Sequence, residues 1–236
     1  MNVRARVLEL ARRFAQVYPA ARTELAFSNA LELLIATILS AQCTDKRVNL
    51  VTPALFRKYR SAADYARSNP AEFEREIHST GFFRNKTKSI RAACDAIANR
   101  HGGKVPAIME ELTALPGVGR KTANVVLGNA FEKNEGVVVD THVARLSQRL
   151  RLTKHTDPEK IERDLMRIVP REKWAVWSHW LIFHGRQRCF ARKPDCSNCE
   201  VFDLCPSGKI FLRTGVARAP LTGNAKQPVA QQIRKR

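Results

Sequence analysis

Residues 115–127 read Leu-Pro-Gly-Val-Gly-Arg-Lys-Thr-Ala-Asn-Val-Val-Leu, and they restrict the local fold more than any other stretch of this sequence. Pro116 cannot occupy the interior of a helix, and Gly117 and Gly119 allow backbone angles that other residues avoid. Apolar residues recur at helical spacing on both sides of these positions. The stretch therefore predicts two helices joined by a tight hairpin, whose free N–H groups and helix N-terminus suit a phosphate group.

Two cations, Arg120 and Lys121, stand in the first turn of the second predicted helix. The helix dipole opposes a positive charge there and so favours the free amine of a lysine, which is its nucleophilic form. This stretch alone leaves two interpretations open. Lys121 is a catalytic nucleophile, or both cations only contact phosphate. Either interpretation places DNA at the hairpin.

The charge of the chain also indicates nucleic acid. There are 41 Lys and Arg against 22 Asp and Glu, a formal net charge of +19. A polyanionic partner explains this excess, and nucleic acid fits better than a membrane because no long apolar span is present. Generic solubility or a ribosome-like environment would give the same composition. No secretory signal is evident, so we expect the six cysteines in a reducing compartment, the cytoplasm, at the nucleoid if the source is bacterial.

Helical periodicity dominates the rest of the chain, for example over 29–39, 108–115 and 174–184. The short apolar run 136–139 could be an isolated strand, but no partner strand is evident, and Asp140 or Thr141 can cap the helix that follows. Residues 206–236 carry seven Lys or Arg and no acidic residue, which is typical of a disordered basic tail. The predicted fold class is all-α.

Four cysteines follow the spacing C-x6-C-x2-C-x5-C, namely Cys189, Cys196, Cys199 and Cys205. Close thiols without a secretory signal predict a metal centre rather than disulfides. Zinc sites usually combine two close cysteine pairs and this run has one, so the spacing favours a [4Fe–4S] cluster, with zinc as the alternative. Arg192 and Lys193 are expected at the tip of the intervening loop, where they hold a DNA phosphate or stay solvated. Cys43 and Cys94 are interpreted as small core residues.

Four motifs together resemble the endonuclease III family: the Leu-Pro-Gly-Val-Gly-Arg-Lys-Thr-Ala hairpin, Val-Asp-Thr-His at 139–142, the cysteine spacing, and Leu-Ser-Ala-Gln-Cys-Thr-Asp at 39–45. The resemblance covers residues 3–211. It implies a helix–hairpin–helix DNA glycosylase with abasic-site lyase activity, which removes oxidised pyrimidines from duplex DNA in base excision repair. It also implies a [4Fe–4S] cluster. We expect a monomer whose partner is double-stranded DNA with a damaged base or an abasic site, and no membrane partner.

The resemblance further implies two helical domains with a DNA-binding cleft between them. A six-helix domain over 23–134 would hold the hairpin. Residues 1–22 and 135–211 would form the iron–sulfur domain, and 212–236 the basic tail.

Site residues follow from the same resemblance. Lys121 matches the family nucleophile and Asp140 its essential carboxylate, while His142 nearby is expected to make a structural hydrogen bond. Gln42 matches the residue inserted where the flipped nucleotide had been. Phe82 stands where the family usually has an aliphatic wedge against the opposite strand, so the opposite-base preference is not predicted. The other expected DNA contacts are Gly117, Gly119, Arg120, Arg192 and Lys193, and the expected cluster ligands are Cys189, Cys196, Cys199 and Cys205.

Two other functions share part of this pattern. Adenine glycosylases that act on mismatches share the hairpin, the aspartate and the cluster, but typically lack the lysine and carry a large additional C-terminal domain. A non-enzymatic DNA-binding protein could use the hairpin and cluster only for docking. The presence of Lys121 disfavours the first, and the presence of both Lys121 and Asp140 disfavours the second.

Overall fold

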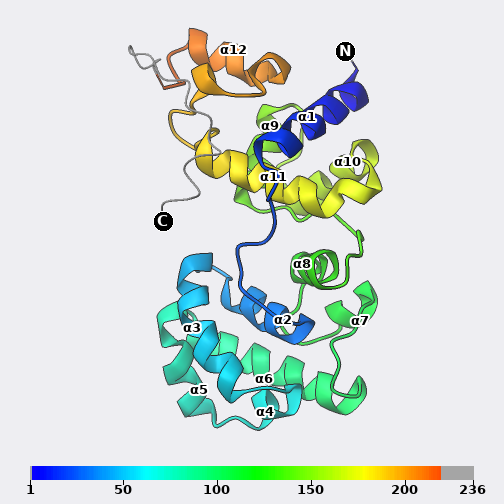
Figure 1. The fold of residues 1–236 in the computed structure, drawn as a ribbon, viewed down its shortest axis with the longest axis vertical. Coiled ribbons are helices and arrows are strands. Elements are labelled where there is room, and N and C mark those ends of the chain that lie inside the picture. The colour runs from blue at the N-terminus through cyan, green and yellow to red at the C-terminus, as the bar shows by residue number, and fades with distance from the viewer. Residues whose placement is uncertain (1, 219–236) are drawn as a thin grey trace. The chain divides into compact units, whose positions relative to one another are not determined.

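The computed structural model describes residues 2–218, and every regular element in that range is a helix (Figure 1). This confirms the all-α prediction. The chain divides into two compact units, Thr23–Glu135 and the segments on either side of it. This boundary lies one residue after the predicted one at 134, and the cleft expected between the units stays a prediction. No helix within the described range is long and apolar enough to cross a membrane.

The unit Thr23–Glu135 contains seven α-helices, where six were expected. They are α2 (Ala30–Leu39), α3 (Asp45–Lys58), α4 (Ala62–Arg67), α5 (Pro70–Ile77), α6 (Phe83–Arg100), α7 (Met109–Thr113) and α8 (Arg120–Ala130), with a 3-10 turn, η1 (His78–Thr80), before α6. Helix α4 has only six residues, but Ser61 and Asp64 form a capping box at its start. Such a reciprocal pair of hydrogen bonds satisfies N–H groups at the start of the helix and so stabilises even a short one.

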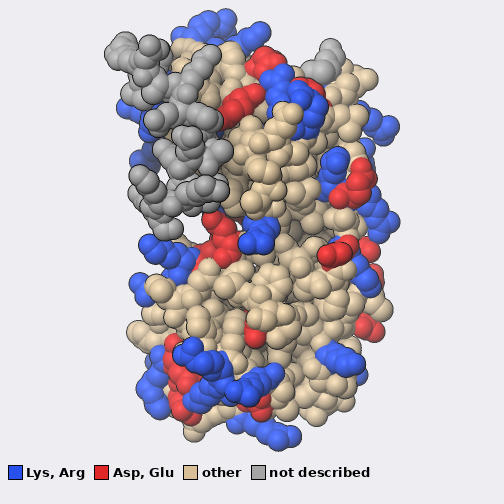
Figure 2. All heavy atoms as spheres, viewed as in Figure 1, with Lys and Arg blue, Asp and Glu red and all other residues tan. Residues whose placement is uncertain are grey.

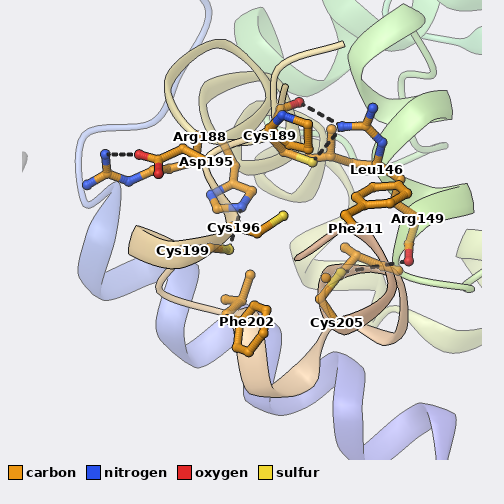
Figure 3. A pocket seen from close by; sticks show the side chains of 15 residues that line it. Leu146, Arg149, Arg188, Cys189, Asp195, Cys196, Cys199, Phe202, Cys205 and Phe211 are labelled. Atoms are coloured by element: carbon orange, nitrogen blue, oxygen red, sulfur yellow. Dashed lines mark hydrogen bonds and ion pairs between the residues drawn. The ribbon is translucent and has the colours of Figure 1, made fainter. Parts of the chain in front are cut away.

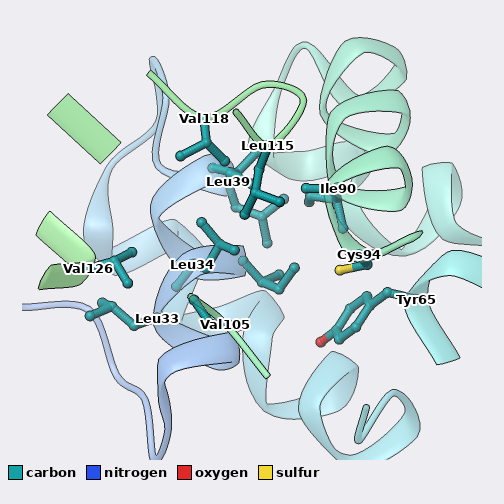
Figure 4. Packing of buried hydrophobic residues seen from close by; sticks show 14 of the residues in the cluster. Leu33, Leu34, Leu39, Tyr65, Ile90, Cys94, Val105, Leu115, Val118 and Val126 are labelled. Atoms are coloured by element: carbon teal, nitrogen blue, oxygen red, sulfur yellow. The ribbon is translucent and has the colours of Figure 1, made fainter. Parts of the chain in front are cut away.

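Helix α2 supplies the centre of the hydrophobic core in this unit (Figure 4). Six of its ten residues are buried, and Leu33 and Leu34 are fully enclosed. The hairpin residues Leu115 and Val118 belong to the same cluster, and so does Cys94, as predicted. The hairpin between α7 and α8 is therefore anchored by the core. Helix α7 is shorter than the predicted 108–115, since Ile108 is its N-cap and is 51% exposed, and the helix ends at Thr113.

The second unit is built from helices on either side of the first in sequence. They are α1 (Val3–Val17), α9 (Thr141–Arg149), α10 (Pro158–Ile168), α11 (Trp174–Gln187) and α12 (Pro206–Arg213), with 3-10 turns η2 (Arg171–Lys173), η3 (Cys196–Asn198) and η4 (Phe202–Leu204). Its core is a separate cluster that includes Phe14 of α1 and Trp177 of α11. Val137 and Val139 are buried in it, and the run 136–139 is neither helix nor strand.

The C-terminal boundary of this unit differs from the predicted one. Residues 212 and 213 belong to helix α12, and the Arg218 N–H donates to the Pro194 carbonyl at 2.9 Å. Residues 212–218 are thus part of the folded unit, because they pack back on the cysteine segment. The remainder of the predicted tail, 219–236, lies outside the described residues. Figure 2 shows Lys and Arg side chains spread over the visible face of both units, with Asp and Glu among them.

Candidate functional site

The two glycines of the hairpin have different structural roles. Gly117 has a φ of +76°, and a Cβ there would lie 2.5 Å from Cβ of Ser89 on α6. The fold therefore needs a glycine at this position for packing as well as for backbone freedom. Gly119 has a φ of −89° and would place a Cβ in open space, so the fold itself does not require glycine there.

Gly119 is the N-cap of α8 and offers no side chain to the first turn of that helix. The leading N–H groups of a helix have no partner within the helix. Arg120 and Lys121 are both exposed in this first turn. The N-terminus of α8 therefore combines open backbone donors, the positive end of a helix dipole and a lysine amine that a ligand can reach.

Asp140 lies in the other unit, where it caps α9. One of its carboxylate oxygens accepts a hydrogen bond from the Val143 N–H at 2.8 Å, as predicted for a helix cap. The ring of His142 lies 3.1 Å from an Arg145 nitrogen, and this agrees with the structural role expected for it. A Cβ at Gly185 of α11 would lie 2.8 Å from that ring. Gly185 is thus a packing position beside His142 and Arg145 that the sequence did not reveal.

Gln42 and Phe82 occupy two exposed loops with left-handed backbone. Gln42 has a φ of 53° and Phe82 a φ of 47°, and Phe82 is 61% exposed. Only a few per cent of residues other than glycine adopt such angles, at a cost of about 1 kcal/mol or more. Lys193, a third predicted DNA contact, is also left-handed with a φ of 49°. Within residues 2–218, three of the five left-handed residues other than glycine are thus positions singled out from the sequence, and the other two are Glu132 and Arg151.

The four cysteines of the predicted metal centre line one pocket (Figure 3). Each lies at or beside a short turn, since η3 begins at Cys196, Cys199 follows it, and Cys205 precedes α12. Burial raises the pKa of Cys196 to about 11, and it also raises the pKa of Cys199 and Cys205. Metal binding there must displace thiol protons. Within residues 2–218, no three His, Cys, Asp or Glu side chains are close enough to hold a single metal ion.

Nitrogen donors approach two of the four sulfurs. Arg149 of α9 lies 3.1 Å from Sγ of Cys189, and Nε2 of His184 lies 3.5 Å from Sγ of Cys199. Burial lowers the pKa of His184 to about 3, so the ring is neutral. Its Nδ1 is 3.0 Å from the Tyr18 hydroxyl. If Nε2 carries the proton toward sulfur, Tyr18 donates to Nδ1. These donors suit sulfur atoms that carry negative charge.

The loop between the first two cysteines is held by Arg149. This side chain donates to the carbonyls of Phe190 at 2.7 Å and Ala191 at 2.9 Å. The next two residues, Arg192 and Lys193, are exposed. The loop thus presents both predicted cations to solvent from a fixed base. Neither Arg149 nor His184 was predicted, because an isolated Arg or His in a helix carries no motif.

Comparisons with known proteins extend the local observations. A family model described as HhH-GPD superfamily base excision DNA repair protein matches residues 35–171. Endonuclease III of Synechocystis sp. (strain ATCC 27184 / PCC 6803 / Kazusa) is 56% identical over 194 residues, 82% of this chain and 89% of that protein. A non-covalent endonuclease III–DNA complex and a trapped endonuclease III–DNA covalent intermediate each align with a TM-score of 0.84 at 42% identity, covering 90% of this chain and 100% of theirs.

Proposed function

The chain belongs to the endonuclease III family of HhH-GPD superfamily base excision DNA repair proteins, and we propose from this premise that Lys121 and Asp140 carry its reaction. It is a bifunctional enzyme that combines DNA glycosylase and abasic-site lyase activity, and its partner is DNA. We infer that its substrates are oxidised pyrimidines in duplex DNA. The proposal depends most on Lys121, which is exposed and is the second residue of α8, directly after the hairpin.

Lys121 attacks C1′ of the damaged nucleotide as the neutral amine, whose lone pair forms the new bond. The bond between C1′ and the base breaks, and the base leaves with that electron pair and takes up a proton. Loss of a proton from nitrogen and opening of the sugar ring give a Schiff base. The Schiff base acidifies the C2′ proton, and its removal expels the 3′ phosphate by β-elimination. Water then hydrolyses the Schiff base and releases Lys121.

Asp140 is proposed as the electrostatic partner of this attack. One of its oxygens is used by the helix cap, which fixes the carboxylate and leaves the other oxygen for the sugar. A fixed carboxylate stabilises the positive charge that develops on the sugar as the base departs, and it can accept a proton from the attacking amine. The cap and the catalytic role are therefore compatible.

Gln42 and Phe82 are proposed to enter the duplex when the damaged nucleotide is extruded. A base inside the stack cannot present C1′ to a nucleophile, so the nucleotide must leave the helix at a cost of a few kcal/mol. Two exposed side chains on strained loops can fill the void and so lower that cost. The left-handed backbone at both positions supports this assignment, because strain of this kind concentrates at functional sites.

The four clustered cysteines are proposed to hold a [4Fe–4S] cluster. The set of donors fits this group, since four thiols line one pocket and cationic or N–H groups approach two of the sulfurs. In a four-iron cluster each thiolate binds its own iron, so the sulfurs need not converge on one ion. The cluster would supply cross-links within the loop, and the loop would present Arg192 and Lys193 to DNA phosphates.

Borohydride trapping on duplex DNA that contains thymine glycol tests the assignment of the nucleophile. The wild-type enzyme should form a covalent complex on reduction of the Schiff base and should nick the strand. Lys121→Gln keeps the length and polarity of the side chain but has no amine, so trapping and nicking should both vanish while binding survives. If Lys121→Gln is still trapped, another amine is the nucleophile. Release of adenine from a mismatch without nicking would instead favour the adenine glycosylase class.

A further inference from the structure

Lys86 is a buried cation that joins two loops far apart in sequence. It lies in the first turn of α6 and is only 4% exposed. Its ammonium nitrogen donates to the carbonyl oxygens of Leu39 and Thr80, each at 2.8 Å. Leu39 is the last residue of α2, and Thr80 is the last residue of η1. One nitrogen atom therefore holds these two carbonyl oxygens close together, since their separation cannot exceed twice the 2.8 Å hydrogen-bond distance.

These two positions lead directly into the two loops proposed to enter the duplex. Leu39 precedes Gln42 by three residues, and Thr80 precedes Phe82 by two. Gln42 and Phe82 both have left-handed backbone, a narrow region of conformation in which a small change at the preceding residues redirects the side chain. The backbone leading to each exposed side chain is thus anchored, two or three residues earlier, at a carbonyl that Lys86 holds.

A buried ammonium is a poor way to stabilise a fold. Burial lowers the pKa of Lys86, which reflects the cost of removing its charge from water. Both of its partners are carbonyl oxygens. The first of them ends α2, where the helix dipole favours a cation, whereas the first turn of α6, on which Lys86 stands, disfavours one. An ammonium can satisfy two such carbonyls at once and at a fixed spacing, which an apolar side chain cannot do.

We propose that Lys86 is a positioning residue that sets the Gln42 loop and the Phe82 loop at the spacing needed for both side chains to enter the duplex together. The proposal rests on the roles assigned above to Gln42 and Phe82. Because Lys86 is only 4% exposed, it would act through these two loops and not by contact with DNA or the reacting atoms. Its contribution is preorganisation, and it should matter most when a stacked, paired nucleotide has to be extruded.

Lys86→Met tests the proposal, because methionine keeps the apolar stem and removes the donors. Excision of thymine glycol from a fully paired duplex, under single-turnover conditions, should slow by at least about tenfold, the scale of a small misplacement. Nicking of a pre-formed abasic site, where no base has to be unstacked, should slow much less. The fluorescence of 2-aminopurine beside the lesion should report the same loss of unstacking on binding.

Arg91→Met is the matched control. Arg91 also lies on α6 and donates from its side chain to a backbone carbonyl, that of Ala66, at 3.1 Å. It ties α6 to α4 rather than to either loop. Arg91→Met should change both reactions by the same factor. An equal effect of Lys86→Met on both reactions would make Lys86 an ordinary structural tether and overturn the proposal.

A double-mutant cycle separates the proposal from the assignments beneath it. In the combined Gln42→Ala, Phe82→Ala background, Lys86→Met should slow excision no further, since the residues through which it acts are gone. A full additional loss would overturn the role of Lys86. If the double variant Gln42→Ala, Phe82→Ala slows excision from paired DNA and nicking of an abasic site equally, the roles assigned to Gln42 and Phe82 are wrong. This result is distinguishable from a failure of the role of Lys86 alone.

Lys86→Gln distinguishes a positioning role of Lys86 from a general folding defect. Glutamine is neutral and shorter but keeps two N–H donors, so its defect should be selective for paired lesions and smaller than that of Lys86→Met. If both variants are unfolded where Arg91→Met is folded, Lys86 serves the stability of the unit and the proposal is overturned.

Discussion

Gly119 can be exchanged to separate folding from DNA binding. It is the N-cap of α8, with a φ of −89° and open space where a Cβ would be. Aspartate at that position can accept a hydrogen bond from the helix, so Gly119→Asp should keep thermal stability or raise it by a few tenths of a kcal/mol. Its charge should repel phosphate and weaken binding to damaged and undamaged duplexes alike. Thermal melting and fluorescence anisotropy measure the two effects, and a matching loss of stability would contradict this account.

Gly117 should behave in the opposite way. Gly117→Ala adds a Cβ that would lie 2.5 Å from Cβ of Ser89 at a φ of +76°. Overpacking of this kind costs about 1–3 kcal/mol, and it should appear in urea denaturation. Gly119→Ala is the control and should cost less. Equal stabilities of the two alanine variants would show that the hairpin is not fixed by its contact with α6.

Asp140→Asn tests whether the carboxylate does more than cap α9. Asparagine is as good an N-cap as aspartate, so the bond to Val143 and the melting temperature should be retained. Release of a damaged base should slow by about a hundredfold or more, the usual scale of general acid–base catalysis. Cleavage of pre-formed abasic DNA should fall less. Unchanged base release would leave Asp140 with a structural role alone.

Residues in motifs could be predicted from the sequence, and residues that act through long-range contacts could not. Lys121, Asp140 and the four cysteines stand at recognisable spacings, and the structure brings the cysteines around one pocket. Lys86 contacts a carbonyl 47 residues away, and Arg149 reaches Ala191 across 42 residues. A single Lys or Arg within a helix normally faces solvent, so no local pattern distinguishes these two from the other basic residues.

Local sequence signals gave the type of most helices but not all of their boundaries. Asp140, one of the two residues predicted as a cap, is the N-cap of α9. Asp157 is the N-cap of α10, and Pro158 opens that helix at a favoured position. Helix α7 is shorter than its apolar pattern at both ends, since Ile108 precedes it and is exposed, and Leu115 follows it and is buried in the core. The second unit extends past its predicted end at 211, because α12 runs to Arg213. Gly215 follows the C-cap with a φ of +68°, which is a common way for a helix to end.

The loop between Cys189 and Cys196 makes its own prediction about DNA. Arg192 and Lys193 are exposed on it, and Arg149 holds its base. Arg192→Ala and Lys193→Ala should each weaken binding and reduce the slope of log affinity against log salt by about one, the change for one lost phosphate contact. Lys160→Ala, an exposed cation on α10, is the comparison. Unchanged slopes in both loop variants would remove the loop from the interface.

The two units have separate hydrophobic cores, and this separation predicts how the protein unfolds. The cluster around α2 draws all of its buried residues from Thr23–Glu135, and the cluster around Trp177 draws none from that segment. All three tryptophans of the chain, Trp174, Trp177 and Trp180, lie on α11 in the second core. Tryptophan fluorescence therefore reports on the unit with the cysteines, whereas circular dichroism reports on the helices of both.

Cys199→Ser uses this difference to test the role of the cysteine centre. The wild-type protein should be brown, with broad absorbance near 400 nm and about four irons per chain. Loss of one ligand should remove the iron and destabilise the loop it cross-links. The midpoint of the fluorescence transition should then fall, by about 4–8 °C for each kcal/mol lost in a small domain, while the transition of Thr23–Glu135, seen by circular dichroism, stays in place.

Cys94→Ala is the control, because Cys94 is buried in the core of Thr23–Glu135. Its loss should lower the transition of that unit seen by circular dichroism and leave the fluorescence transition in place. One zinc and no iron after anaerobic purification would contradict the cluster, and equal shifts of both transitions in Cys199→Ser would show that the two cores unfold as one.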